Sequence, residues 1–277
     1  MRPVHLFCAV SLLAFLPASM AGADTKAQPA RISAAEIVAK NIAARGGASA
    51  WHALQTLEMK GKMEAGGNQR AGVPIPGETK VAMNAMPTRP KDQVQLPFLM
   101  DLKRGHKQRV EIEFKGQTAV QVYDGSNGWK LRPFLNRREV EKFSPEELRA
   151  ASADSDIDGY LLDYSAKGSK VELDGTEEVD GRKAYKLKVT DRNANTRHVW
   201  VDAETFLEAK IEGSPRRLDG RYHPVATYFH DYRTVNGLVM PYQLETRVEG
   251  VRDTEKITIE SIVANPKLDD SRFAMPR

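Results

Sequence analysis

The stretch KVELDGTEEVDGRKAYKLKVTDRNANTRHVWVDAETFLEAKIEG, from Lys170 to Gly213, decides the fold. Asp174-Gly175 and Asp180-Gly181 predict tight turns, because glycine adopts positive φ without a Cβ clash. Between the turns, apolar residues occupy every second position, which is the period of a β-strand with one buried face: Val171 and Leu173, then Tyr185, Leu187 and Val189, then Val199 and Val201, then Leu207, Ala209 and Ile211. The pattern predicts antiparallel strands whose charged face can remain in water.

The same alternation recurs on both sides of this stretch. Upstream it predicts strands that carry Leu57, Met59, Gly61 and Met63; Val81, Met83 and Ala85; Val110, Ile112 and Phe114; Val120 and Val122; and Trp129 and Leu131. Downstream it predicts strands over 228–232, 242–248 and 256–262, the first two joined by a turn at Asn236-Gly237. The chain is therefore mainly β.

Two short helices are expected beside these strands. Ser33 followed by Glu36 is a capping box that begins a helix reaching about Arg45, where Gly46-Gly47 ends it. Ser144-Pro145-Glu146-Glu147 begins the second in the same way. The helical spacing of Ile157, Tyr160, Leu161 and Tyr164 predicts further helix after it.

The first 23 residues have the features of a cleavable signal peptide. Arg2 precedes an apolar run from Leu6 to Leu16, and small residues follow, so we expect cleavage after Ala23 and a periplasmic protein. Residues 24–32 form a polar lead expected to be mobile, and 33–277 a single domain. The only cysteine, Cys8, lies in the apolar run, so the mature chain is expected to have no disulfide.

Composition excludes some classes of function. The chain has 277 residues and 41% hydrophobic content, enough for one well-buried core. Without Arg2, Lys and Arg fall from 41 to 40 against 37 Asp and Glu, a formal charge of +3. This is a mixed surface, and we expect no binding to nucleic acid.

Catalysis is not expected. His198 and His230 lie on predicted strands and His223 precedes one, but three or four convergent donors are needed to bind a metal ion. The chain has no HExxH pair, no glycine-rich phosphate loop after a strand and no nucleophile elbow. Asp269-Asp270 suits a turn better than a catalytic pair. We therefore expect no catalytic residues, no metal and no cofactor.

Several motifs resemble those of the outer-membrane lipoprotein-sorting proteins, the LolA-like family. They are Leu173-Asp174-Gly175, Asp180-Gly181, Ala184-Tyr185-Lys186-Leu187, residues 200–205 (WVDAET), residues 228–232, Asn236-Gly237-Leu238 and residues 265–270 (NPKLDD). Gly46-Gly47, Asp124-Gly125 and Gly128-Trp129 also fit. The resemblance implies a curved antiparallel sheet, a half-open barrel with an N-terminal helix and a helical lid. It also implies an apolar cavity that holds the acyl chains of a lipoprotein or another lipid.

The candidate ligand-binding residues lie on the apolar sides of the predicted strands. They are Leu57, Met59, Met63, Val81, Met83, Val110, Ile112, Phe114, Val120, Val122, Tyr185, Leu187, Val189, Val199 and Val201. Methionine suits acyl chains of varied shape because its thioether side chain is flexible, although it also fills ordinary cores. As a carrier, the protein is expected to be a monomer that meets membrane-bound donor or acceptor proteins. The alternative is a noncatalytic envelope module whose sheet binds another protein without a ligand.

Overall fold

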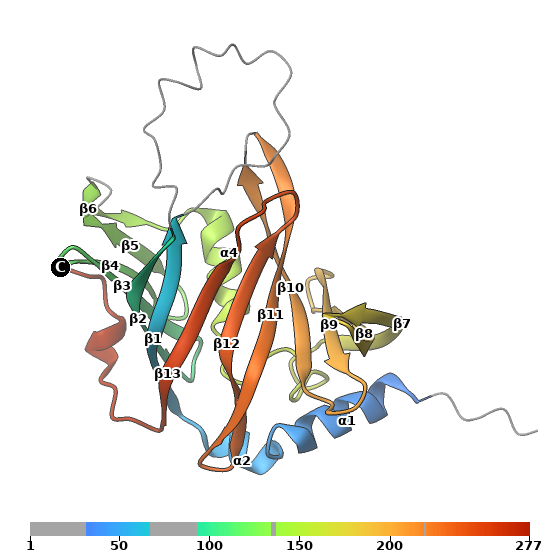
Figure 1. Cartoon of the computed structure of the whole chain (residues 1–277). Helices are drawn as coiled ribbons and strands as arrows, with labels where there is room; N and C mark the ends of the chain where they lie inside the picture. The colour runs from blue at the N-terminus through green and yellow to red at the C-terminus, as the bar shows by residue number, and fades with distance from the viewer. Residues whose placement is uncertain (1–31, 67–92, 134–136, 219) are drawn as a thin grey trace, which may run out of the picture. The chain divides into compact units, whose positions relative to one another are not determined.

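The computed structural model describes residues 32–66, 93–133, 137–218 and 220–277, which form one compact unit (Figure 1). Candidates Val81 and Met83, like the expected signal peptide, lie outside the described residues. The elements follow in the order α1 (Ala34–Ala44), α2 (Ala48–Ala53), β1 (Thr56–Gly66), β2 (Gln93–Lys103), β3 (Lys107–Phe114), β4 (Gln117–Tyr123), β5 (Gly128–Arg132), β6 (Arg137–Lys142), α4 (Pro145–Asp154), β7 (Lys170–Val179), β8 (Arg182–Thr190), β9 (Thr196–Asp202), β10 (Glu208–Leu218), β11 (Arg221–Val235), β12 (Leu238–Val248), β13 (Glu255–Ala264) and η2 (Asp270–Phe273).

The described strands form one antiparallel sheet of 13 strands, in the order β6-β5-β4-β3-β2-β1-β13-β12-β11-β10-β9-β8-β7. Strands adjacent in sequence pair with each other, except that β1 pairs with β13 and β6 does not pair with β7. The sheet is thus open between β6 and β7. The expected half-open barrel with covering helices is confirmed.

The turns at Asp180-Gly181 and Asn236-Gly237 are where the sequence predicted them. Both residues of each pair have positive φ, 47° and 79° in the first and 50° and 83° in the second. A two-residue hairpin needs this conformation because its twist matches that of the strands. Gly46 packs against the second turn so closely that a Cβ there would lie 2.1 Å from the Gly237 carbonyl oxygen.

Two local predictions within this region were wrong. Asp174-Gly175 does not separate two strands: it lies inside β7, where the pairing with β8 shifts between Leu173 and Thr176 as a β-bulge. Helix α4 begins with the predicted capping box but ends at Asp154, and residues 157–168 form turns. Positive φ at Gly159, Asp163 and Gly168 interrupts the helical geometry that the apolar spacing had indicated.

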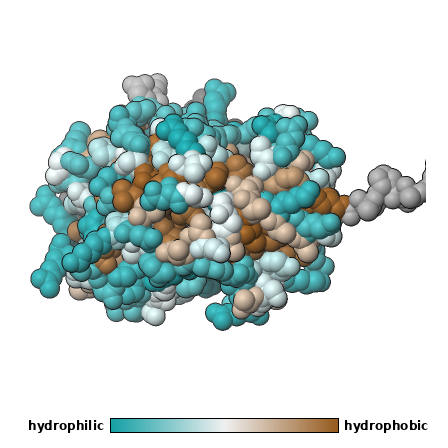
Figure 2. Space-filling model, turned by 90° about the horizontal axis from the view of Figure 1, so that it is seen from below, coloured by the Kyte–Doolittle hydropathy of each residue, from teal (hydrophilic) through white to brown (hydrophobic). Residues whose placement is uncertain are grey.

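Helices and turns cover one face of the sheet, here called the inner face. Helix α1 has the predicted Ser33–Glu36 capping box and contributes Ile37 and Val38, which are buried against β8 and β9. Trp51 of α2 packs in a second cluster with β1, β2, β12 and β13. Both helices lie at the bottom of Figure 1, and the view from below shows an apolar band between hydrophilic flanks (Figure 2).

The C-terminal segment covers part of the opposite, outer face. Phe273 in η2 is 1% exposed and packs against Val120 and Val122 of β4, with Leu268 beside them. Arg272 fixes the segment to the sheet through hydrogen-bonded ion pairs with Asp101 and Glu111. The outer face of the sheet therefore carries a small apolar cluster of its own, here called the outer cluster.

Candidate functional site

The register of the strands brings apolar side chains from distant parts of the chain into rows on the inner face. Met63 of β1 is opposite Ile257 of β13, Ile257 is opposite Leu244 of β12, and Leu244 is opposite Phe229 of β11. Directly opposite residues of antiparallel strands project to the same face. All four side chains are half-buried, so this row is apolar without being sealed in the core.

The inner face carries two apolar clusters. The first contains buried residues of β1, β2, β12 and β13 together with Trp51, Leu54, Ile157 and Leu162. The second joins β8 and β9 to α1 and Leu161. Ile42 of α1 contacts both clusters, so the helix connects the apolar surfaces of the two halves of the sheet.

Ten of the predicted ligand-binding residues belong to these inner clusters. In the first cluster lie Leu57, Met59, Met63, Val110 and Ile112, and in the second lie Tyr185, Leu187, Val189, Val199 and Val201. Leu187, Val199 and Val201 are fully buried, whereas Met59, Met63, Val110, Ile112 and Tyr185 are half-buried. Phe114, at the end of β3, is also half-buried, and the register gives it the same face as Ile112. Their role in ligand binding remains a prediction.

The predicted site required Val120 and Val122 to lie on the inner face, but they lie on the outer face. Val120 is opposite Glu111 and Val122 is opposite Arg109. Glu111 and Arg109 alternate along β3 with Val110 and Ile112, so both valines project to the face opposite that of Val110 and Ile112. Both valines are buried beneath Phe273. They belong to the outer cluster and were wrongly grouped with the candidate site.

Sequence reasoning missed residues of three strands that contribute to the inner face. Leu96, Phe98, Met100 and Leu102 alternate along β2, which was not predicted, although the pattern was present. Pro97 lies between two of these apolar positions, and β3 pairs with β2 only as far as Phe98. Also missed as candidates were Leu238, Met240, Tyr242, Leu244, Ile257, Ile259 and Ile262 of β12 and β13.

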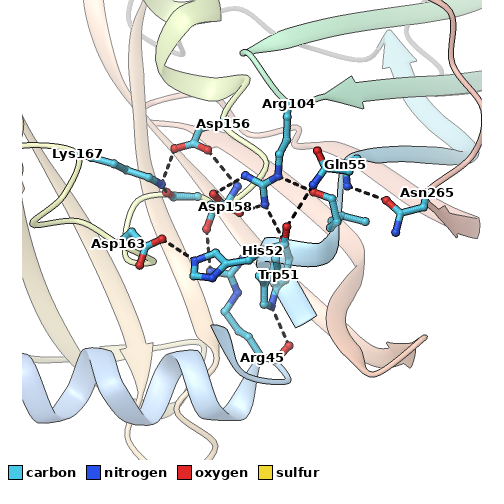
Figure 3. Close-up of polar contacts among 12 residues, drawn as sticks. Arg45, Trp51, His52, Gln55, Arg104, Asp156, Asp158, Asp163, Lys167 and Asn265 are labelled. Carbon is cyan, nitrogen blue, oxygen red and sulfur yellow. Dashed lines mark hydrogen bonds and ion pairs between the residues drawn. The ribbon is translucent and has the colours of Figure 1, made fainter. Parts of the chain in front are cut away.

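Arg104 is the centre of a polar cluster that holds the turns of residues 155–168 beside α2 (Figure 3). Its Nη1 and Nη2 donate to Asp158 Oδ2 and Oδ1, both at 2.8 Å. Its Nη2 and Nε also donate to the carbonyl oxygens of Trp51 and Leu54 at 2.6 and 2.7 Å. One guanidinium thus connects the β2–β3 turn, the end of α2 and the covering turns.

The charges in this cluster are compensated. Burial of Asp158 acts to raise the pKa of its carboxyl group, but the hydrogen bonds from Arg104, together with the nearby positive charges of Arg104 and Lys167, outweigh burial and keep that pKa below its ordinary value. Arg45, which lies over the Trp51 ring, donates to the Asp158 carbonyl oxygen at 3.1 Å and pairs with Glu208 at 3.4 Å. Nearby, Lys167 pairs with Asp156 and His52 with Asp163, both at 2.6 Å. The arrangement is suited to holding segments together.

The histidines of the described strands contact carboxylates or carbonyls. His198 pairs with Glu212 at 2.7 Å, and His230 lies 3.7 Å from Asp180. His223 Nδ1 is 2.9 Å from the Glu249 carbonyl oxygen. Across the described part of the chain, no group of three or more His, Cys, Asp or Glu residues is placed to hold a metal ion. Within the same residues, no helix is long and apolar enough to span a membrane.

Comparison with known proteins identifies the fold. No family model matches the chain, and no curated protein matches it. Among solved structures, the chain is similar to a LolA superfamily protein from Nitrosomonas europaea, with 13% identity, coverage of 88% of this chain and 98% of the other, and a TM-score of 0.53. It is also similar to a DUF1329 family protein from Desulfovibrio piger (14% identity, 87% and 97% coverage, TM-score 0.51).

A third solved structure is a putative outer membrane lipoprotein-sorting protein domain from Vibrio parahaemolyticus. It has 12% identity, coverage of 86% of this chain and 94% of the other, and a TM-score of 0.51. The chain therefore has the LolA-like fold that its turn motifs suggested. At these identities the likeness establishes the fold, and function has to be argued from the inner face.

Proposed function

We propose that this protein is a noncatalytic periplasmic carrier that binds the acyl chains of a lipoprotein or another lipid on the inner face of its sheet. The observation that carries the proposal is the row of half-buried apolar side chains formed by Met63, Ile257, Leu244 and Phe229. Large apolar side chains that remain partly exposed on a concave sheet can gain free energy by contact with an apolar ligand.

The position of the covering segments supports this proposal, because they pack on the two inner clusters and contribute no residue to the apolar row. Helices α1 and α2 and residues 155–168 contribute buried residues to the two clusters, including Ile37, Trp51, Leu54 and Leu161. No residue of these segments belongs to the row from Met63 to Phe229, which lies further along the strands. An acyl chain on that row would lie beside the existing core without replacing it.

The first test is extraction of the purified periplasmic protein followed by lipid mass spectrometry. The second uses the apolar fluorescent probe N-phenyl-1-naphthylamine and competition by long-chain lipids. In Met63→Trp, an indole on the inner face should weaken probe binding several-fold with little loss of stability. If this position is closed core, overpacking should cost about 1–3 kcal/mol of unfolding free energy.

Val263→Trp is the matched control, because Val263 is on the outer face of β13 and 44% exposed. This variant should bind the probe like the wild type. A wild-type protein that carries no lipid and binds no probe would remove the carrier proposal. The interaction-module alternative would then be favoured.

A further inference from the structure

The β10–β11 hairpin extends beyond its neighbours at the end of the sheet remote from α1. Helix α1 contacts the other end, where the Val239 N–H donates to the Arg45 carbonyl oxygen at 2.9 Å. Strand β11 begins at Arg221, but its pairing with β12 begins only at Val225, so the overhang is about 13 Å of extended chain. The hairpin rises above the β12–β13 turn at the top of Figure 1. Residues 216–218 and 220–223, here called the hairpin tip, therefore project from the sheet.

Contacts at its base hold the hairpin tip on the sheet. Arg216 Nη1 and Nη2 donate to Glu255 Oε1 and Oε2 of β13 at 2.7 and 2.9 Å. The Glu249 N–H donates to the Pro224 carbonyl oxygen at 2.9 Å, and His223 Nδ1 lies 2.9 Å from the Glu249 carbonyl oxygen. The tip is therefore ordered before it meets a partner, so little entropy is lost on binding.

The tip exposes an aromatic ring beside arginines. Tyr222 is 61% exposed, the highest value for a large hydrophobic residue in the described part of the chain. Arg217 is opposite Tyr222 and Leu218 is opposite Arg221, and these two pairs project to opposite faces of the hairpin. Both arginines are exposed, and neither has an ion-pair partner among the described residues. The tip therefore presents apolar and cationic groups on both faces.

The turn beside the tip adds groups of the same two kinds. Residues 216–223 contain three arginines against one carboxylate. In the β12–β13 turn, Arg252 and Glu249 are exposed without an ion-pair partner among the described residues. Val94, at the start of β2, is 40% exposed, and its neighbour Gln93 donates to the Thr254 carbonyl oxygen of this turn at 2.9 Å. Unpaired guanidinium groups therefore outnumber unpaired carboxylates across the two turns, with apolar side chains among them.

The inner face stays largely apolar from the apolar row to the tip. Next to the apolar row lies a short polar row that consists of Glu255, Thr246 and Thr227. The two threonine Oγ1 atoms are 3.3 Å apart, so one hydroxyl can donate to the other. Beyond the threonines, Val225 is opposite Val248, and these side chains are only 9% and 7% exposed. The apolar surface therefore continues on the side of the sheet where the tip projects.

We propose that the hairpin tip docks this protein on an anionic lipid surface. Tyr222 enters the interfacial layer, which suits a side chain with an apolar ring and a polar hydroxyl. Arg217 and Arg221 bind lipid phosphates, to which guanidinium groups form strong charge-assisted hydrogen bonds. Docking is a second interaction beyond the proposed binding of acyl chains. It places the end of the apolar inner face at the membrane that supplies or receives such a chain.

The shape of the tip favours a lipid surface over an acidic protein. A stable protein interface buries roughly 1,200–2,000 Å² and needs a broad complementary surface. The exposed groups of the tip lie on both faces of two paired strands, so no single flat partner covers them together. A lipid interface surrounds a narrow tip that enters end-on, and it supplies phosphates and apolar surface to both faces.

Cosedimentation of the purified protein with vesicles tests the proposal. The wild type should bind vesicles that contain phosphatidylglycerol, bind phosphatidylcholine vesicles far more weakly, and lose affinity as salt screens the charges. Arg217→Gln/Arg221→Gln should bind the anionic vesicles about thirtyfold more weakly. The matched control, Lys183→Gln/Lys267→Gln, removes the same net charge from exposed lysines on β8 and after β13, and it should bind like the wild type.

Two substitutions of Tyr222 locate the contact. On vesicles with brominated lipid, Tyr222→Trp should lose more fluorescence than the wild type, whereas Val263→Trp, with its indole near the other end of β13, should not. Tyr222→Ser should weaken vesicle binding several-fold, because it removes apolar area from the contact. Met275→Ser, at a side chain that is 54% exposed outside the tip, should leave binding unchanged.

The outcomes separate docking from the proposed function. Melting curves check folding, which these exposed positions should tolerate well. A wild type that does not bind anionic vesicles at low salt overturns the docking proposal. So do equal losses in the two double variants, or Tyr222→Trp emission that brominated lipid does not quench. None of these measurements uses N-phenyl-1-naphthylamine, so they are independent of the test of the carrier proposal.

Discussion

Replacing Arg104 by alanine should destabilise the fold more than any exposed ion pair can account for. The substitution removes two hydrogen bonds to the Asp158 carboxylate and two to backbone carbonyls. It leaves a carboxylate in a residue only 6% exposed. Losing one partner of a fully buried pair costs about 3–5 kcal/mol. Because the Arg104 side chain is 30% exposed, we expect the lower end, about 3 kcal/mol.

The unfolding free energy lost in Arg104→Ala should decrease as the pH falls. The pKa of Asp158 is lowered in the folded protein, so its pairing contributes stability fully above the unfolded pKa, about 3.9 for an aspartate. That contribution is lost as the pH falls through the lower folded pKa. The difference in unfolding free energy between wild type and Arg104→Ala should therefore be largest near neutral pH and narrow in acid, where protonation of Asp158 removes the charge that Arg104 compensates.

Urea unfolding monitored by circular dichroism measures the difference, provided that the m-value is unchanged. Arg233→Ala is the matched control: Arg233 makes two hydrogen bonds to Asp231, but the side chains are 55% and 45% exposed. The control should lose no more than about 1 kcal/mol. Equal losses in the two variants, or a loss in Arg104→Ala that does not narrow in acid, would refute the reasoning.

Four other predictions follow from the structure and the sequence. Gly61→Ala should cost about 3 kcal/mol in urea unfolding, because the new Cβ would lie 2.0 Å from the Thr258 carbonyl oxygen; a near-neutral effect would contradict the β1–β13 register. Phe273→Ala should cost about 3–5 kcal/mol through the cavity under η2, yet leave probe binding unchanged, since Phe273 packs on the outer face. Chelation should leave the melting temperature unchanged, and a tightly held zinc or iron ion would argue against this. N-terminal sequencing should find Asp24 first, whereas Met1 on the folded protein would remove the periplasmic assignment.

The sequence predicts most individual strands because a buried strand face imposes a period of two that few other structures share. Helix caps and tight turns also depend on residues close together in the sequence. Four such predictions are confirmed: the caps at Ser33 and Ser144 and the turns at Asp180-Gly181 and Asn236-Gly237. Local chemistry was misleading at Asp174-Gly175, because the same dipeptide that closes a hairpin also suits a β-bulge.

The face on which a strand's apolar residues lie is not a local property. Alternation shows that Val120 and Val122 share one face of their strand, and that Val110 and Ile112 share one face of theirs. It does not show whether the two pairs lie on the same face of the sheet, because a turn separates the two strands. Only the register, in which Val120 is opposite Glu111, assigns the two sets to opposite faces. The apolar residues of β4 are buried by Phe273, which lies far along the chain in the C-terminal segment. The sequence gives no indication of that contact.

Long-range pairing also explains why the polar row was not foreseen. Glu255, Thr246 and Thr227 are polar residues near the ends of their strands, and each alone suits a solvated strand end. They become a row only because β11, β12 and β13 pair in one register, and Arg216 joins them from a fourth strand. The apolar row beside them arises from the same pairing. A one-residue slip between β12 and β13 would turn one set of side chains to the other face. Which side chains share a face of the sheet is therefore determined by register.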